Sequence, residues 1–160
     1  MAVTKFTQEI KVKVSSKRLF KAFATDPYTV LPKILPNFIK SVEIIHGDGG
    51  AGTIRQTNFA DGAPHSYMKH KIEHLDAENH VAKYSLIEGA VLGDKIEKIS
   101  YDQKYEDTSD GGCVIKIVGE YHTKGNFQVT EEDIKAGKDE ALQTVKHVEE
   151  ILLAHPDICA

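Results

Sequence analysis

Tyrosines at alternating positions are the side chains of this sequence whose chemistry most needs an explanation. Tyr84, Tyr101 and Tyr121 each alternate with charged residues in segments of strand-like pattern. Alternate residues of a β-strand share one face, so the three phenols are expected on the buried face of a sheet. A buried phenol needs a hydrogen-bond partner. With Thr57 and Gln103 on the same face, the phenols indicate either a pocket lined for a ligand or a core whose hydroxyls reach the rim or the backbone.

Arg55 falls on the same predicted face as Thr57 and Phe59. Burying a lone cation is costly unless it is paired or faces water. Two interpretations are open. The guanidinium anchors an acidic ligand group at the mouth of a cavity, or Arg55 lies at an edge and its guanidinium extends into solvent.

A glycine-rich stretch formed by Gly47, Gly49, Gly50 and Gly52 satisfies the pattern GxGxxG. A dinucleotide-binding loop needs a helix after the glycines, whereas Thr53–Phe59 alternates as a strand. A phosphate loop of the NTPase type needs a lysine directly after the last glycine, and none is present there. We predict a turn between two strands, with weak anion binding by its backbone amides as the alternative.

Metal binding and nucleophilic catalysis find little support. His70 and His74 are four residues apart, a spacing that on a strand separates them by ~13 Å, although His70 can serve as an inward polar contact. Cys113 and Cys159 are too few for a disulfide framework or a zinc site of cysteines and are expected to be reduced thiols. No serine lies in a nucleophile elbow. We predict no metal, no cofactor and no catalytic residue.

The elements that must position these side chains are mostly strands. Alternation of period two, broken by turn-forming residues, predicts seven strands at Phe6–Val14, Ile39–His46, Thr53–Phe59, His65–Leu75, His80–Ile87, Lys95–Tyr105 and Cys113–Thr123. Two short helices are predicted at Lys17–Ala24 and Tyr28–Leu35, the second limited by Pro32 and Pro36. Consecutive strands with short turns form an antiparallel meander, and helices segregated from strands indicate an α+β domain.

One long amphipathic helix is predicted at Thr130–Ala154. Thr130 is followed by three acidic residues, which is a capping-box signature, and Pro156 prevents continuation. One face is apolar, formed by Ile134, Ala141, Val145, Val148 and Leu152. At about 1.5 Å per residue such a helix crosses a small domain and is expected to close one side of a curved sheet. Its buried face is thin at Gly137 and Ala141, where we expect a hollow for a ligand.

Length and charge limit the class of protein. The 160 residues predict one domain over residues 1–160. The chain has 20 Lys and Arg against 24 Asp and Glu, a net charge of -4, which argues mildly against nucleic acid as a partner. No signal segment and no window near the ~18 apolar residues of a membrane span are present. A soluble, cytoplasmic protein without a membrane partner is expected, most simply a monomer.

Five motifs spread along the chain carry a further signal: residues 42–54, which contain the glycine stretch, residues 84–89, 96–101 and 121–125, and the ending 152–156. Together they resemble the plant pathogenesis-related class ten proteins, the family of the major birch pollen allergen. The resemblance covers essentially the whole chain. It implies a helix-grip fold, in which a seven-stranded curved antiparallel sheet wraps around a long C-terminal helix, with two short helices in a V and a large internal cavity.

The resemblance also implies a function. Family members are defence- or stress-related intracellular proteins that bind amphiphilic molecules such as flavonoids, cytokinins and other phytohormones, sterols or fatty acids, as carrier or store. Positions that match the family's cavity lining are Phe23, Tyr28, Arg55, Thr57, Phe59, Tyr67, His70, Ala82, Tyr84, Leu86, Ile99, Tyr101, Ile117, Tyr121, Ala136, Glu140, Ala141 and Thr144. Ala82 stands where many relatives carry tyrosine, which should widen the pocket. Arg55 replaces the usual lysine and changes the donor geometry.

Three other activities known among proteins of this fold are alternatives. A ribonuclease of this family would use Arg55 and Glu149, but the tyrosine expected two residues after the glutamate is Ile151 here. The receptors that bind abscisic acid and inhibit phosphatases carry gate and latch sequences that residues 60–64 and 89–94 lack. Enzymes that condense alkaloids use a lysine in the cavity. We place no such lysine on the predicted buried face of the sheet.

Overall fold

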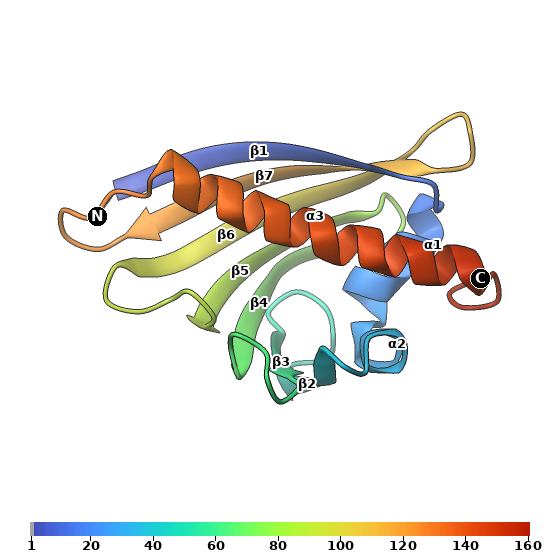
Figure 1. Cartoon of the computed structure of the whole chain (residues 1–160), viewed down its shortest axis with the longest axis horizontal. Helices are drawn as coiled ribbons and strands as arrows, with labels where there is room; N and C mark the ends of the chain where they lie inside the picture. The colour runs from blue at the N-terminus through green and yellow to red at the C-terminus, as the bar shows by residue number, and fades with distance from the viewer. Residues whose placement is uncertain (1) are drawn as a thin grey trace.

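Seven antiparallel strands form one curved sheet in the computed structural model, which describes residues 2–160 (Figure 1). The strands are β1 (Ala2–Val12), β2 (Ile39–His46), β3 (Ile54–Phe59), β4 (Tyr67–Asp76), β5 (Val81–Gly89), β6 (Ile96–Asp107) and β7 (Cys113–Thr123). Their order is β1-β7-β6-β5-β4-β3-β2, so β2 to β7 form a meander and β1 pairs with the last strand. The predicted α+β fold with a seven-stranded sheet is confirmed.

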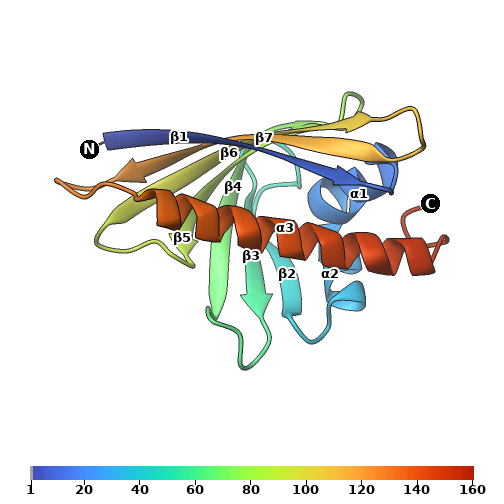
Figure 2. The same cartoon turned by 45° about the horizontal axis from the view of Figure 1, so that its top comes forward.

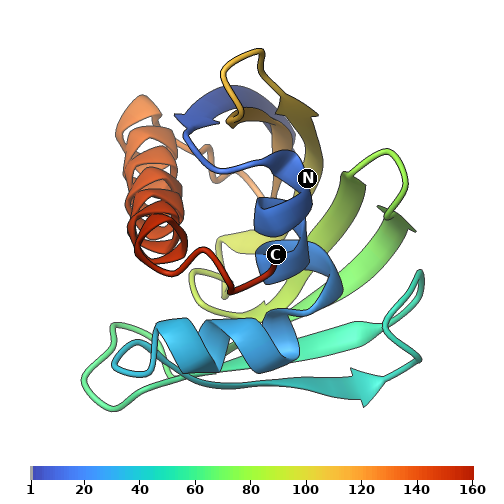
Figure 3. The same ribbon diagram turned by 90° about the vertical axis from the view of Figure 1, so that its right-hand side faces the viewer.

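The described residues also form four helical segments: α1 (Ser16–Phe20), the π-helical segment η1 (Lys21–Thr25), α2 (Pro27–Ile34) and α3 (Glu131–Ala154). The predicted capping box starts α3, because the Asp133 N–H donates to the Thr130 hydroxyl at 3.1 Å and the Thr130 N–H donates to the Asp133 carboxylate at 3.0 Å. The sheet curves around α3, and α1 and α2 lie near its C-terminal half (Figures 2 and 3). None of these helices has the length and apolar character needed to cross a membrane.

The C-terminal half of α3 anchors this helix to the rest of the fold. Leu152 is fully buried in the core formed by the sheet, α1 and α2. The Glu149 carboxylate accepts the Lys13 N–H at 2.6 Å, and the Arg18 guanidinium donates to three backbone carbonyls at the C-terminal end of the chain. Residues 131–144, by contrast, are mostly exposed or half-buried. The helix is therefore held firmly at one end and covers the concave face with the other.

Most element boundaries lie within two residues of the sequence predictions, and three differences have a structural reason. The first strand begins at Ala2 instead of Phe6, because its pairing continues along the whole of β7. The helix expected over Lys17–Ala24 begins as α1 and continues as η1, where a backbone hydrogen bond spans five residues. Pro32 was expected to limit the second helix but lies inside α2, where it removes one helical hydrogen bond.

Gly47 occupies a position that other residues cannot take without strain. Its φ is +105°, and a Cβ would stand 2.6 Å from the Thr53 hydroxyl oxygen. Gly52 has a φ of +88°, but no atom of residues 2–160 outside its immediate neighbours lies within 4 Å of its added Cβ. We expect Gly47→Ala to lower the free energy of unfolding by about 3 kcal/mol and Gly52→Ala by about 1 kcal/mol, measured by urea denaturation. Equal losses would exclude the Thr53 contact as the cause.

Candidate functional site

A group of polar side chains, two of them buried and two half-buried, lies at the concave face of the sheet. Arg55 on β3 and His70 on β4 are direct cross-strand partners. The Arg55 guanidinium lies over the Tyr84 ring of β5, 5.1 Å from its centroid, and the centroids of the His70 and Tyr84 rings are 6.2 Å apart. Tyr28 of α2 belongs to the same group, because its phenol opposes ionisation of the Tyr84 phenol. We call Tyr28, Arg55, His70 and Tyr84 the polar cluster.

The polar cluster is not satisfied internally. Within residues 2–160, the buried atoms Tyr28 Oη, His70 Nδ1 and Tyr84 Oη have no hydrogen-bond partner. The Arg55 side chain is 8% exposed, reaches the Ala24 carbonyl at 3.5 Å, and pairs with no carboxylate of the described chain. Buried polar groups in proteins are normally paired. The cluster therefore offers one cation and three unsatisfied polar atoms, an arrangement that suits the polar end of a ligand.

Burial governs protonation in the polar cluster. Burial, assisted by the charge of Arg55, lowers the pKa of His70 to about 3, so its imidazole is neutral at pH 7. Burial raises the pKa of Tyr84, and the Arg55 charge opposes this rise. Burial likewise raises the pKa of the neighbouring Tyr101. At neutral pH the cluster thus carries one positive charge, that of Arg55. The alternative in which Arg55 extends into solvent is excluded by its burial.

Tyr121 lies next to Gly137, at the thinnest part of α3. Its ring packs against Phe6, with 5.3 Å between the centroids. Its hydroxyl lies 2.8 Å from the position that a Cβ on Gly137 would take, and Gly119 leaves room for the Phe6 ring. A phenol therefore lies next to Gly137, and the hollow expected at Gly137 and Ala141 stays a prediction.

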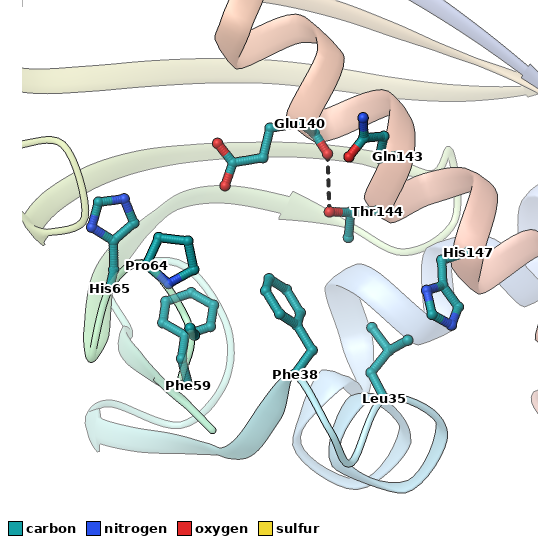
Figure 4. Close-up of a pocket in the computed structure, with 10 residues that line it drawn as sticks. Leu35, Phe38, Phe59, Pro64, His65, Glu140, Gln143, Thr144 and His147 are labelled. Carbon is teal, nitrogen blue, oxygen red and sulfur yellow. Dashed lines mark hydrogen bonds between the residues drawn. The ribbon is translucent and has the colours of Figure 1, made fainter. Parts of the chain in front are cut away.

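A pocket of about 330 Å³ opens between α3 and the end of the concave face (Figure 4). Its lining residues are Leu35, Phe38, Phe59, Ala63, Pro64, His65, Glu140, Gln143, Thr144 and His147. In Figure 4, Glu140 and Thr144 on α3 face Phe38 and Phe59, whose ring centroids are 5.4 Å apart. Phe59 lies four residues from Arg55 on the same strand, about 13 Å away. The pocket and the polar cluster thus lie along one strand of the concave face.

Most of the predicted lining residues lie on the concave face or on the side of α3 that covers it. Three of them line the pocket: Phe59, Glu140 and Thr144. Eight are buried: Arg55, Thr57, Ala82, Tyr84, Leu86, Ile99, Ile117 and Tyr121. Five are half-buried: Phe23, Tyr28, His70, Tyr101 and Ala141. The other two lie elsewhere, since the Tyr67 hydroxyl donates to the exposed Glu88 carboxylate at 2.7 Å and Ala136 is exposed.

Seven pocket residues were not singled out from the sequence: Leu35, Phe38, Ala63, Pro64, His65, Gln143 and His147. They come from the turn after α2, the connection between β3 and β4, and the side of α3 next to its apolar face. Strand periodicity does not reach the two turns. Of these residues, Phe38 was the easiest to predict from the sequence, because it is an aromatic residue directly before a predicted strand.

Three backbone amides of the glycine stretch are not free to bind an anion. The N–H groups of Gly49, Gly50 and Gly52 donate to Thr53 Oγ1 at 2.8 Å, to Asp48 Oδ1 at 3.0 Å and to the Ile72 carbonyl at 2.7 Å. Because these donors are already paired inside the protein, the loop is a structural turn.

Glu149 and the two cysteines are part of the packed structure of the protein. The Glu149 carboxylate holds the Lys13 amide and pairs with the Lys146 ammonium at 3.4 Å, so it secures α3 to the end of β1. Cys113 and Cys159 are buried free thiols. No cluster of three or more His, Cys, Asp or Glu residues in the part of the chain that the structure describes could hold a metal ion.

Comparison with known proteins agrees with this architecture. The profile of the pathogenesis-related protein Bet v 1 family matches residues 1–155. The major allergen Pru av 1 of Prunus avium is 46% identical over 98% of both chains. The solved structure of Ara h 8.0201 has a TM-score of 0.82 and 30% identity, covering 96% of this chain and 100% of that one. Norcoclaurine synthase from Thalictrum flavum has a TM-score of 0.72 and 28% identity, covering 96% and 88%. The chain therefore belongs to the pathogenesis-related protein Bet v 1 family.

Proposed function

We propose that this protein binds amphiphilic small molecules between the concave face of the sheet and α3, as a carrier or store in the cytoplasm of plant cells under stress or attack. The observation that carries the proposal is the polar cluster, whose buried unpartnered atoms lie on the same face as an aromatic pocket. Flavonoids, cytokinins and other phytohormones, sterols and fatty acids all combine an apolar body with a few polar groups, which is the chemistry that such a site accommodates.

The expected affinity is moderate. Burying about 200 Å² of apolar ligand surface contributes roughly 5 kcal/mol before the entropy of association is subtracted. A few hydrogen bonds to the polar cluster add to this value. Before that subtraction the total is close to the roughly 8 kcal/mol of a micromolar dissociation constant, so binding no tighter than micromolar is expected, which suits a carrier that must also release its ligand.

Phe59 provides a direct test, because it lines the pocket and its neighbour Asn58 does not. Asn58 donates instead to the Ser41 hydroxyl at 2.9 Å. With the neutral dye N-phenyl-1-naphthylamine as probe, Phe59→Ala should raise the dissociation constant by about 5- to 20-fold, since an aromatic contact of about 1–2 kcal/mol is lost. Asn58→Ala should leave it unchanged. Fluorescence titration measures both, and equal effects of the two substitutions, or no saturable binding, would contradict the proposal.

Two enzymatic alternatives have less support. Ribonuclease action would need a free Glu149 carboxylate, but this group is engaged by Lys13 and Lys146. The similarity to norcoclaurine synthase makes a cavity enzyme the second candidate, at 28% identity and without an assigned catalytic residue in this chain. Product formation from an amine and an aromatic aldehyde, above the uncatalysed rate, would favour that candidate.

A further inference from the structure

Arg55 and His70 form an unusual pair on the concave face. They are directly opposite each other on antiparallel strands, where side chains on one face have Cβ atoms about 5 Å apart. Both can carry a positive charge, and the His70 Nδ1 atom is buried with no partner in residues 2–160. Two groups of the same potential charge at this separation disfavour each other, and burial with the Arg55 charge lowers the pKa of His70 to about 3.

Within residues 2–160, no carboxylate forms an ion pair with Arg55. Tyr84 of β5 and Tyr101 of β6 present phenols, with ring centroids 6.2 and 6.5 Å from that of His70. Tyr28 of α2 presents a third phenol; besides burial, this phenol acts through space to raise the pKa of Tyr84. The Tyr105 phenol already donates to Gln103 at 3.2 Å. The acidic group that faces this region from α3 is Glu140, whose side chain is at the exposed pocket.

A ligand with a negative charge would pair with the Arg55 guanidinium and would also give the unpartnered polar atoms of the cluster a hydrogen-bond partner. Its oxygen atoms would accept hydrogen bonds from the Arg55 guanidinium and from the Tyr28 and Tyr84 hydroxyls. These bonds are stronger to an anionic acceptor than to a neutral one. Its charge would also reverse the field at His70, because an opposite charge within about 4–6 Å favours the protonated imidazole. His70 Nδ1 would then become a further donor to the same anion.

We infer that the polar cluster takes the anionic end of an amphiphilic acid and that His70 binds a proton when the anion enters. This inference rests on the binding function proposed above and specifies its ligand class and its regulation. By linkage, a group whose pKa is raised by the ligand makes binding tighter as the pH falls. A more acidic compartment would promote loading, and a more alkaline one would promote release.

Two dyes with the same apolar body separate charge from hydrophobic binding. The probe 8-anilinonaphthalene-1-sulfonate carries a charge that stays constant between about pH 5 and 8, and N-phenyl-1-naphthylamine lacks the sulfonate. From about pH 7.5 to about pH 5.5 the affinity for the sulfonate is expected to rise by about three- to tenfold, while that for the neutral dye stays level. Calorimetry near pH 6 in two buffers of different ionisation enthalpy should show uptake of a fraction of a proton with the sulfonate alone.

Matched histidine variants assign the proton. His70→Gln keeps a polar side chain but cannot titrate, so the rise in affinity and the proton uptake should disappear. His74→Gln, an exposed position four residues further along β4, should retain both. The NMR resonances of the His70 imidazole test the inference in the wild-type protein, without any substitution. Without dye the imidazole should stay neutral down to about pH 5, and with the sulfonate bound it should become protonated at a higher pH.

The outcomes distinguish the two proposals. Loss of proton uptake in His70→Gln and its retention in His74→Gln support the inference. Binding of both dyes with no proton uptake, or uptake that survives His70→Gln, would overturn it while the binding function stands. If neither dye binds, the binding function itself is overturned, and the inference with it.

Discussion

Replacing Leu152 by alanine is expected to lower the free energy of unfolding by about 2–5 kcal/mol, which is the cost of deleting a buried leucine side chain and leaving a cavity. Leu152 is 0% exposed and packs where α3 meets the core of the sheet and α1. Because residues 131–144 have few buried side chains, α3 depends on this anchor. The amides of that segment should therefore exchange faster in the variant, as measured by hydrogen exchange.

Leu153 is the matched control for this prediction. It is the next residue of the same helix and is 46% exposed. Leu153→Ala should change the free energy of unfolding by no more than about 0.5 kcal/mol. Urea denaturation of both variants compares them directly, and similar losses would mean that the buried contact of Leu152 does not hold α3 in place.

Replacing Arg55 by methionine is expected to stabilise the protein while it weakens the binding of anions. The buried guanidinium pairs with no carboxylate of residues 2–160, so an apolar side chain of similar length should raise the free energy of unfolding by about 1–3 kcal/mol. Loss of a charged hydrogen-bond donor should weaken binding of 8-anilinonaphthalene-1-sulfonate by about 10- to 100-fold. Such opposite effects on stability and binding are typical of a functional site.

Lys71 provides the control for the Arg55 substitution. It is a cation on β4 that is exposed instead of buried. Lys71→Met should change neither stability nor dye binding appreciably. Thermal denaturation and fluorescence titration give the two quantities. A destabilised Arg55→Met protein would show that the guanidinium is well satisfied without a ligand, and the argument from its unmet charge would fail.

Periodicity in the sequence predicted most of the fold for a physical reason. Cys113–Thr123 alternates strictly because one face of β7 is buried and the other is exposed, so its limits were predicted to the residue. The change from α1 to η1 carries no such signal, because both kinds of helix place apolar residues at similar spacings. Parity likewise placed Arg55 and Tyr84 on the inner face, where the structure has them buried.

The pairing within the site could not be predicted from parity. Which residue lies opposite Arg55 depends on the register of β3 and β4, which turn geometry sets. A register shift between Lys69 and His70 further alters the pairing of β4 with β5. The family resemblance predicts Tyr67 in the cavity lining. Tyr67 and His70 instead lie on opposite faces of β4, and the Tyr67 hydroxyl donates to the exposed Glu88 carboxylate. Contacts made by turns, such as those of Phe38, depend on the tertiary fold alone.

The most direct measurement of the central claim is the position of a bound ligand. Nuclear Overhauser effects between N-phenyl-1-naphthylamine and isotope-labelled protein locate the dye against individual side chains. We expect contacts with the rings of Phe59 and Tyr84 and with the Leu86 methyl groups, all on the concave face. Contacts confined to exposed apolar residues such as Ile44 and Val91, which are 42% and 51% exposed, would contradict binding between the sheet and α3.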